Sequence, residues 1–311
     1  MFKLGRFAVG LIVFVILALG ACNESSNKSK PALEPPYFKA VEGINFIEVR
    51  REFDTGLSFS REGFQQKPEW NLYFLPGDSV KIYSPFKKRY IYYPIYNDYA
   101  GKINFAREWL RLIHVSRDSL VLQLLRVQSQ KVNRELSTVY MRFYSEAYIK
   151  NELKTNAELL KRPRRNDTLY VKHLIKRADL NAKTPDSILS ATEPVELKSK
   201  VKEVTVFKRK LKKGDINYSP SDEYLYPEYD VVIHKAYKDF AYSFTVLVDT
   251  AGKMTVGRFA FIEPDFEAPQ RKIRQSVTDV YLQRFLVIIP GSTLGIPHTT
   301  EIMLNVKGIK D

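Results

Sequence analysis

The chain has 311 residues, of which 44% are hydrophobic and 13% aromatic, and its formal net charge is +14. This composition supports a folded core, and the length is enough for two domains. Cys22 is the only cysteine, which excludes a disulfide within the chain and a metal site built from several thiolates.

The first residues have the pattern of a secretory signal. Lys3 and Arg6 precede an uncharged apolar run from Phe7 to Ala21, which is shorter than the about 20 residues that a helix needs to cross a bilayer. We therefore expect residues 1–21 to be a signal peptide. The sequence Leu-Gly-Ala-Cys that ends at Cys22 resembles a bacterial lipobox. This resemblance implies that Cys22 carries the lipid; an ordinary signal peptide that ends in Cys is the alternative.

Residues 22–36 are polar and contain proline, so we expect a flexible lipidated tether. Cys22 is followed by Asn23 rather than Asp, which by resemblance to lipoprotein sorting favours the outer membrane, facing the periplasm. The expected partners are the membrane, through the lipid on Cys22, and an envelope protein. Because an envelope lipoprotein leaves the cytoplasm, we expect no nucleic acid as a partner.

Residues 37–150 show short apolar and aromatic runs with two-residue alternation, separated by turn residues such as Pro76-Gly77-Asp78. This pattern predicts about seven strands in a small barrel or sandwich. The predicted strands span residues 46–49, 70–74, 79–83, 89–95, 109–115, 120–127 and 139–144.

Residues 151–220 form a basic connector. The segment 161–213 contains 16 Lys/Arg and 6 Asp/Glu, and we predict helices over 146–161 and 169–180 and a strand over 201–207. Asp167 or Thr168 is the expected cap of the second helix. Lys208, Arg209 and Lys210 are candidate contacts with an anionic surface; a solvated loop is the alternative.

Residues 221–311 predict a small α+β domain. Strands are expected over 240–248, 254–262 and 300–306, with a tight hairpin turn at Asp249–Lys253. A helix near 268–286 should cover one face of the sheet with a buried stripe of apolar residues. The stripe consists of Ile273, Val277, Val280 and Phe285.

This C-terminal pattern resembles the C-terminal domain of TonB-type energy-transducing proteins. The matching residues are Pro227-Glu228, Asp249–Lys253 and the stretch from Pro290-Gly291 to Pro297. The resemblance implies a ββαβ domain that docks to a partner by strand addition at a sheet edge. We expect that deletion of the last strand, Thr300 to Val306, abolishes partner capture. A lipid anchor in place of a transmembrane helix argues against energy transduction. Exposure of Ile273, Val277 and Val280 would contradict this assignment.

Signals of catalysis are weak. The four histidines, His114, His173, His234 and His298, are not at metal-ligand spacing, and the sequence contains no HExxH or Gly-x-Ser-x-Gly motif. We therefore expect no catalytic residues, no metal and no cofactor, and we expect the protein not to be an enzyme.

The segment from Trp70 to Tyr96 is rich in aromatic residues. Core packing explains this pattern, and the alternative is the lining of a lipocalin-like cavity for an apolar ligand. The candidate contacts are Trp70, Tyr73, Tyr90, Tyr92 and Tyr93. The sequence thus predicts an α+β envelope lipoprotein that acts as a tethered adaptor, with a carrier of an apolar ligand as the alternative.

Overall fold

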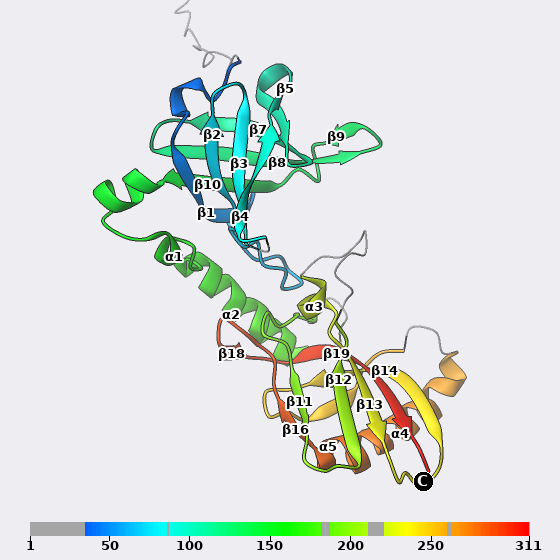
Figure 1. The fold of residues 1–311 in the computed structure, drawn as a ribbon. Helices are drawn as coiled ribbons and strands as arrows, with labels where there is room; N and C mark the ends of the chain where they lie inside the picture. Colours follow the sequence, from blue (N-terminus) through cyan, green and yellow to red (C-terminus); the bar gives the residue numbers. More distant parts are fainter. Residues whose placement is uncertain are drawn as a thin grey trace, which may run out of the picture.

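The structure, a computed structural model, describes residues 35–85, 87–181, 184, 187–210, 221–259 and 263–310. The predicted α+β class is confirmed, because a β-rich N-terminal lobe and a mixed C-terminal lobe lie on either side of the connector helix α2 (Figure 1). The signal peptide, Cys22 and almost all of the tether lie outside the described residues, as do residues 211–213 of the basic segment.

The N-terminal lobe is an antiparallel sheet that curls into a nearly closed barrel. Its strands follow the order β4-β3-β2-β1-β10-β8-β7-β6-β5, and β9 pairs with β8. The two end strands, β4 and β5, are separated in the chain by Ile95 alone, so the chain itself bridges the ends of the sheet. The strands are β1 (Asn45–Phe53), β2 (Asn71–Leu75), β3 (Ser79–Ser84), β4 (Arg89–Pro94), β5 (Tyr96–Asn97), β6 (Lys102–Phe105), β7 (Glu108–Val115), β8 (Ser119–Gln128), β9 (Lys131–Asn133) and β10 (Val139–Ser145).

All seven strands predicted in this lobe are present, and the prediction missed the short strands β5, β6 and β9. Alternate residues point into the barrel, as in β2, where Leu72 and Phe74 are buried between partly exposed neighbours. Large side chains fill the interior, and each contributes about 1.5–3 kcal/mol by leaving water. The largest are Phe46, Phe74, Phe105 and Phe143.

The first connector helix was predicted wrongly as one helix over 146–161. A π-helical turn at Tyr148–Glu152 is followed by the short helix α1 (Ala157–Leu160). Between them, Lys154 has a positive φ of 50°, which an α-helix does not accommodate. Asn156 then accepts a hydrogen bond from the Leu159 N–H and starts α1 afresh.

The second connector helix, α2 (Arg165–Leu180), begins four residues earlier than predicted. Asp167 is therefore in its first turn and not at the N-cap position. Its carboxylate accepts hydrogen bonds from the main-chain N–H of Arg164 and from the side chain of Arg50 in β1. The contact between Asp167 and Arg50 of the barrel thus helps to set where α2 begins, and the local sequence does not predict it.

The C-terminal lobe is built on a five-stranded sheet of order β12-β13-β19-β14-β15, beside the two-stranded pairs β11-β16 and β17-β18. Val195 and Val204 belong to its core, so the expected boundary at residue 221 falls inside one sheet, between β12 and β13. The elements are β11 (Glu196–Ser199), β12 (Val204–Lys208), α3 (Asp222–Leu225), β13 (Glu228–Ile233), β14 (Phe240–Val248), β15 (Met254–Val256), α4 (Pro264–Val277), α5 (Gln283–Phe285), β16 (Leu286–Ile289), β17 (Ser292–Thr293), β18 (Ile296–Pro297) and β19 (Thr300–Gly308).

The last strand, β19, lies in the middle of this sheet. It pairs in parallel with β13 and antiparallel with β14. Both edges of β19 are therefore occupied, so the last strand has no free edge to which a partner strand could add. Deleting this strand would remove the centre of the lobe, so such a deletion does not test partner capture.

The hairpin prediction is confirmed. β14 and β15 pair antiparallel, and Gly252 in the turn has a φ of +77°, which glycine adopts without steric cost. The strand after the turn ends at Val256, earlier than predicted. Gly257 then lies so close to β14 that an added Cβ would be 2.4 Å from the Thr245 hydroxyl oxygen.

The helix also covers one face of the sheet, but the predicted buried stripe is partly wrong. Val277 is buried, whereas Ile273 is 41% and Val280 is 54% exposed. A π-helical turn at Thr278–Leu282 adds a residue to the repeat, so that Leu282 reaches the core instead of Val280. By this criterion the resemblance to a TonB C-terminal domain is not confirmed.

Candidate binding groove

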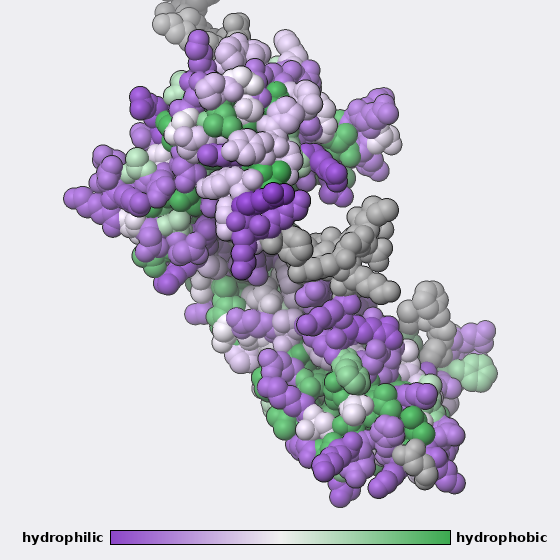
Figure 2. Space-filling model, in the orientation of Figure 1, coloured by the Kyte–Doolittle hydropathy of each residue, from purple (hydrophilic) through white to green (hydrophobic). Residues whose placement is uncertain are grey.

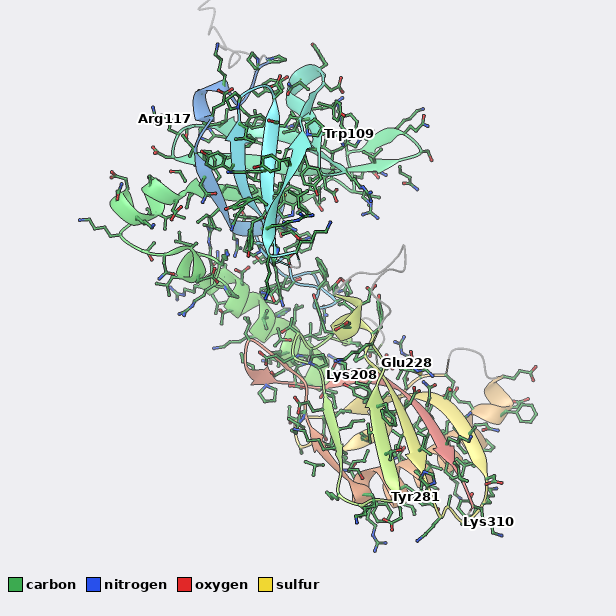
Figure 3. All side chains as sticks on the ribbon, viewed as in Figure 1. Trp109, Arg117, Lys208, Glu228, Tyr281 and Lys310 are labelled. Carbon is green, nitrogen blue, oxygen red and sulfur yellow. The ribbon has the colours of Figure 1, made fainter. Side chains whose placement is uncertain are left out.

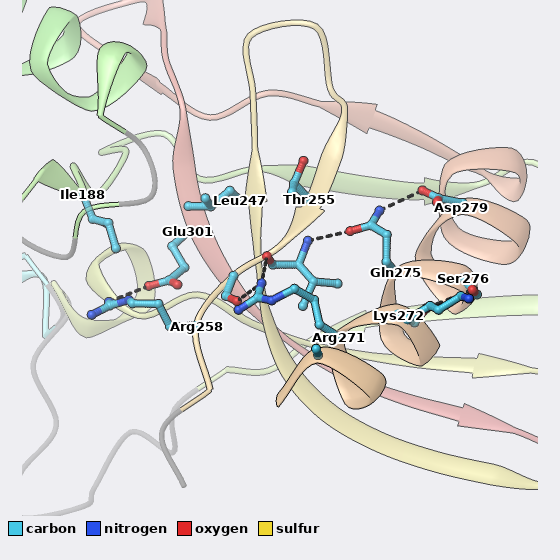
Figure 4. A pocket seen from close by; sticks show the side chains of 13 residues that line it. Ile188, Leu247, Thr255, Arg258, Arg271, Lys272, Gln275, Ser276, Asp279 and Glu301 are labelled. Carbon is cyan, nitrogen blue, oxygen red and sulfur yellow. Dashed lines mark hydrogen bonds and ion pairs between the residues drawn. The ribbon is translucent and has the colours of Figure 1, made fainter. Parts of the chain in front are cut away.

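A pocket of about 710 Å³ lies along the outside of the edge strand β15 (Figure 4). Its walls come from β15, from the polar side of α4 and from the sheet face opposite α4. Its lining includes Ile188, Arg258, Arg271, Gln275 and Glu301.

A second pocket, of about 550 Å³, adjoins the first and shares Ile188, Arg258 and Glu301 with it. It continues over the open face of the sheet, past Met303, to Tyr226 beside α3. We call the two pockets together the β15 groove. Figure 2 shows more apolar residues on the visible face of the C-terminal lobe than on that of the barrel. A groove with apolar patches and scattered polar groups is typical of peptide and small-molecule sites.

Side chains of the covering helix occupy the outer edge of β15. Gln275 accepts a hydrogen bond from the Val256 N–H at 2.9 Å, and Gln283 accepts one from the Met254 N–H at 3.0 Å. Arg271 donates to the Val256 carbonyl at 2.7 Å. Buried or half-buried main-chain groups are costly when unpaired, so these side chains stabilise an edge that would otherwise attract another strand.

The side chain of Gln275 forms the hydrogen bonds that a neighbouring strand would form with β15. Its carboxamide oxygen accepts from the N–H of Val256, and its nitrogen lies 3.4 Å from the carbonyl of Met254. One amide group thus brackets Thr255 on both sides, as the main chain of a parallel strand does. The sheet ends at β15 because helix side chains take the place of a sixth strand.

Glu301 supplies an acceptor inside the groove. Its Oε2 accepts from Arg258 at 3.2 Å, whereas its Oε1 is buried and has no hydrogen-bond partner among the described residues. A buried acceptor without a donor costs about 1–3 kcal/mol. A ligand N–H that reached Glu301 would remove this cost.

The aromatic residues singled out in the sequence do not form one site. Trp70 and Tyr93 pack against the barrel core. Tyr73 and Tyr90 lie on the outer face of the barrel, where the Lys81 ammonium is 4.0 Å and 5.2 Å from their ring centroids. Tyr92 is 67% exposed. Tyr73, Tyr90 and Tyr92 therefore face away from the interior that the carrier hypothesis would fill with a ligand.

The basic stretch lies at the barrel-facing end of the C-terminal lobe, where Lys208 is near Glu228 (Figure 3). Arg209 pairs with Glu228 at 2.6 Å and with Asp230 at 2.8 Å. Its side-chain hydrogen bond to Asp230 raises the pKa of Arg209. Burial lowers the pKa of Lys208. The charge of Arg209 is thus balanced within the lobe.

The histidines lie apart from the groove, which none of them lines. His298 is fully buried, and its ring nitrogens are 3.0 Å from the Thr293 hydroxyl and 3.0 Å from the Thr299 carbonyl. Burial lowers its pKa. Within the described ranges, no group of three or more His, Cys, Asp and Glu side chains is arranged to hold a metal ion.

The sequence matches no protein-family model and no curated protein. In the part of the chain that the structure describes, no helix has the length and apolar character needed to cross a membrane. The site must therefore be interpreted from its own geometry.

The apolar periodicity of the helix does not predict the residues of the β15 groove, because their signal is polar. Arg271, Arg274 and Gln275 recur at positions i, i+3 and i+4, which places polar groups on one helix face. That face packs on the sheet: the guanidinium of Arg274 lies 5.2 Å from the ring centroid of Tyr242. A polar stripe beside a short strand was the available signal.

Proposed function

We propose that the protein is a non-catalytic adaptor of the bacterial cell envelope. In this proposal the lipid on Cys22 anchors the protein to a membrane. The favoured site is the outer membrane, on the side that faces the periplasm. The C-terminal lobe binds an extended segment of an envelope protein in the β15 groove. The resemblance to TonB-type proteins supports this proposal only by the shared order of hairpin, helix and final strand.

The observation that carries this proposal is the groove itself, which is lined by Glu301, a residue whose buried Oε1 has no hydrogen-bond partner among the described residues. Main-chain N–H groups of an extended segment would donate to Glu301, and apolar side chains would contact Ile188 and Met303. The packed barrel interior favours this adaptor hypothesis over the carrier hypothesis, since the interior positions hold large side chains.

Photo-crosslinking in cells tests the proposal. A photoreactive phenylalanine analogue at Met303, which is partly exposed in the groove, should form one discrete crosslinked product. The same analogue at Tyr92, exposed on the barrel, is the matched control. The proposal fails if Met303 gives no product or the same products as Tyr92. Native mass spectrometry that detects an apolar molecule bound to the barrel would support the carrier hypothesis instead.

A further inference from the structure

Helix α2 presents two different faces. One face is buried and packs against Phe59 and Leu189 through Val171 and Leu174. The opposite face is exposed and combines cationic with apolar side chains at intervals of three and four residues, so they form one stripe along the helix. We call it the α2 face; it consists of Arg165, Leu169, Lys172, Lys176 and Leu180.

The cations of the α2 face are available to an external partner. Among the described residues, no ion pair includes Arg165, Lys172 or Lys176. This differs from the basic stretch around Arg209, whose charge is balanced by Glu228 and Asp230. Among the described residues, the α2 face therefore carries three cations without an ion pair on one side of a single helix.

The leucines of the α2 face indicate the kind of partner. Leu169 is 54% and Leu180 is 71% exposed, so the stripe of cations also carries exposed apolar area. Phosphate backbones of nucleic acids are bound by cations and polar groups. A lipid surface instead accepts apolar side chains below its head groups, while Lys and Arg extend to the anionic phosphates.

We propose that the α2 face docks on an anionic lipid surface. Each cation near such a surface strengthens binding by about fivefold, and the two leucines add apolar contact. The helix lies between the barrel and the C-terminal lobe (Figure 1), so docking through it would hold both lobes beside the membrane. This inference is independent of the groove and of its partner.

Vesicle binding tests the proposal. Every described element follows residue 34, so a chain that starts at Asn23 keeps both cores and lacks the signal and the lipid. It should bind vesicles containing phosphatidylglycerol and not vesicles of phosphatidylcholine alone. The variant R165Q/K172Q/K176Q should bind on the order of 100-fold more weakly. Circular dichroism establishes that each variant is folded.

Two further variants make the test specific. K253Q/K307Q/K310Q removes the same charge from exposed sites of the C-terminal lobe and should change binding less than about threefold. L169S/L180S should also weaken vesicle binding, because it removes the apolar contact. Equal losses in the two charge variants, or no binding by the parent chain, would overturn the proposal. So would tighter binding to duplex DNA than to the vesicles, unaffected by L169S/L180S.

Discussion

Asp167 in the first turn of α2 forms a bidentate, buried ion pair with Arg50 of β1, with N–O distances of 2.5 Å and 3.1 Å. The two residues are 117 positions apart. Asp167 also accepts from the Ser58 N–H, and Arg50 donates to the Gly56 carbonyl. The pair therefore joins the barrel, its loop and the connector helix at one point.

Asp167→Asn should lower the free energy of unfolding by about 1.5–3 kcal/mol, because it removes one of the two carboxylates that pair with the buried Arg50 and leaves only Glu52. The tryptophans Trp70 and Trp109 both belong to the barrel, so urea unfolding followed by tryptophan fluorescence measures the effect. Glu158→Gln, which removes an exposed pair with Lys161, should cost less than about 1 kcal/mol. Equal effects would show that the buried pair is not a main support of the barrel.

His298 should make the C-terminal lobe sensitive to acid. Its folded pKa is below the unfolded value of about 6.5. Below that pH the unfolded chain binds a proton that the folded chain does not, so stability is lost as the pH falls towards the folded pKa. The opening free energy of β17–β19, obtained from hydrogen exchange after correction for the intrinsic exchange rate at each pH, should fall between about pH 7.5 and pH 5. His298→Asn should remove this pH dependence. His114→Asn, at an exposed site, should leave it unchanged.

Gln275→Met should open the edge of β15. The Val256 N–H loses its acceptor, which should cost about 1 kcal/mol and accelerate exchange of that amide. An unpaired edge also attracts other strands, so the variant should self-associate as its concentration rises, measured by light scattering. Lys272→Met changes an exposed side chain one turn away and is the control. An unchanged amide exchange rate at Val256 would contradict the capping role.

Gly63→Ala should disturb the contact between the barrel loop and the connector. Gly63 has a φ of +100°, and a Cβ there would lie 2.4 Å from the main-chain oxygen of Ser190. The expected loss is on the order of 2–4 kcal/mol, since strain and backbone overlap add. Gly77→Ala has a similar φ of +77° but no atom within 4 Å of the new Cβ, so it should cost only about 1–2 kcal/mol. Urea unfolding of both variants compares them directly.

The sequence by itself determined most of the local elements. Alternation of apolar residues predicted the main barrel strands, and the turn chemistry at Gly252 predicted the hairpin of β14 and β15. These features depend on neighbours within a few residues, where side-chain periodicity and φ preferences act directly. The sequence also predicted a helix over the C-terminal sheet, but not which face of it would be buried.

Only the tertiary structure decided which distant segments meet. The central position of β19, the Arg50–Asp167 pair and the groove beside β15 all join residues far apart in the chain. Such contacts depend on the order of the strands in each sheet, which is set when long loops of the chain close. Local sequence patterns do not encode that order. In the sequence, the polar stripe of α4 resembles a solvated helix face. Only the tertiary structure shows that these side chains bind the outer edge of β15.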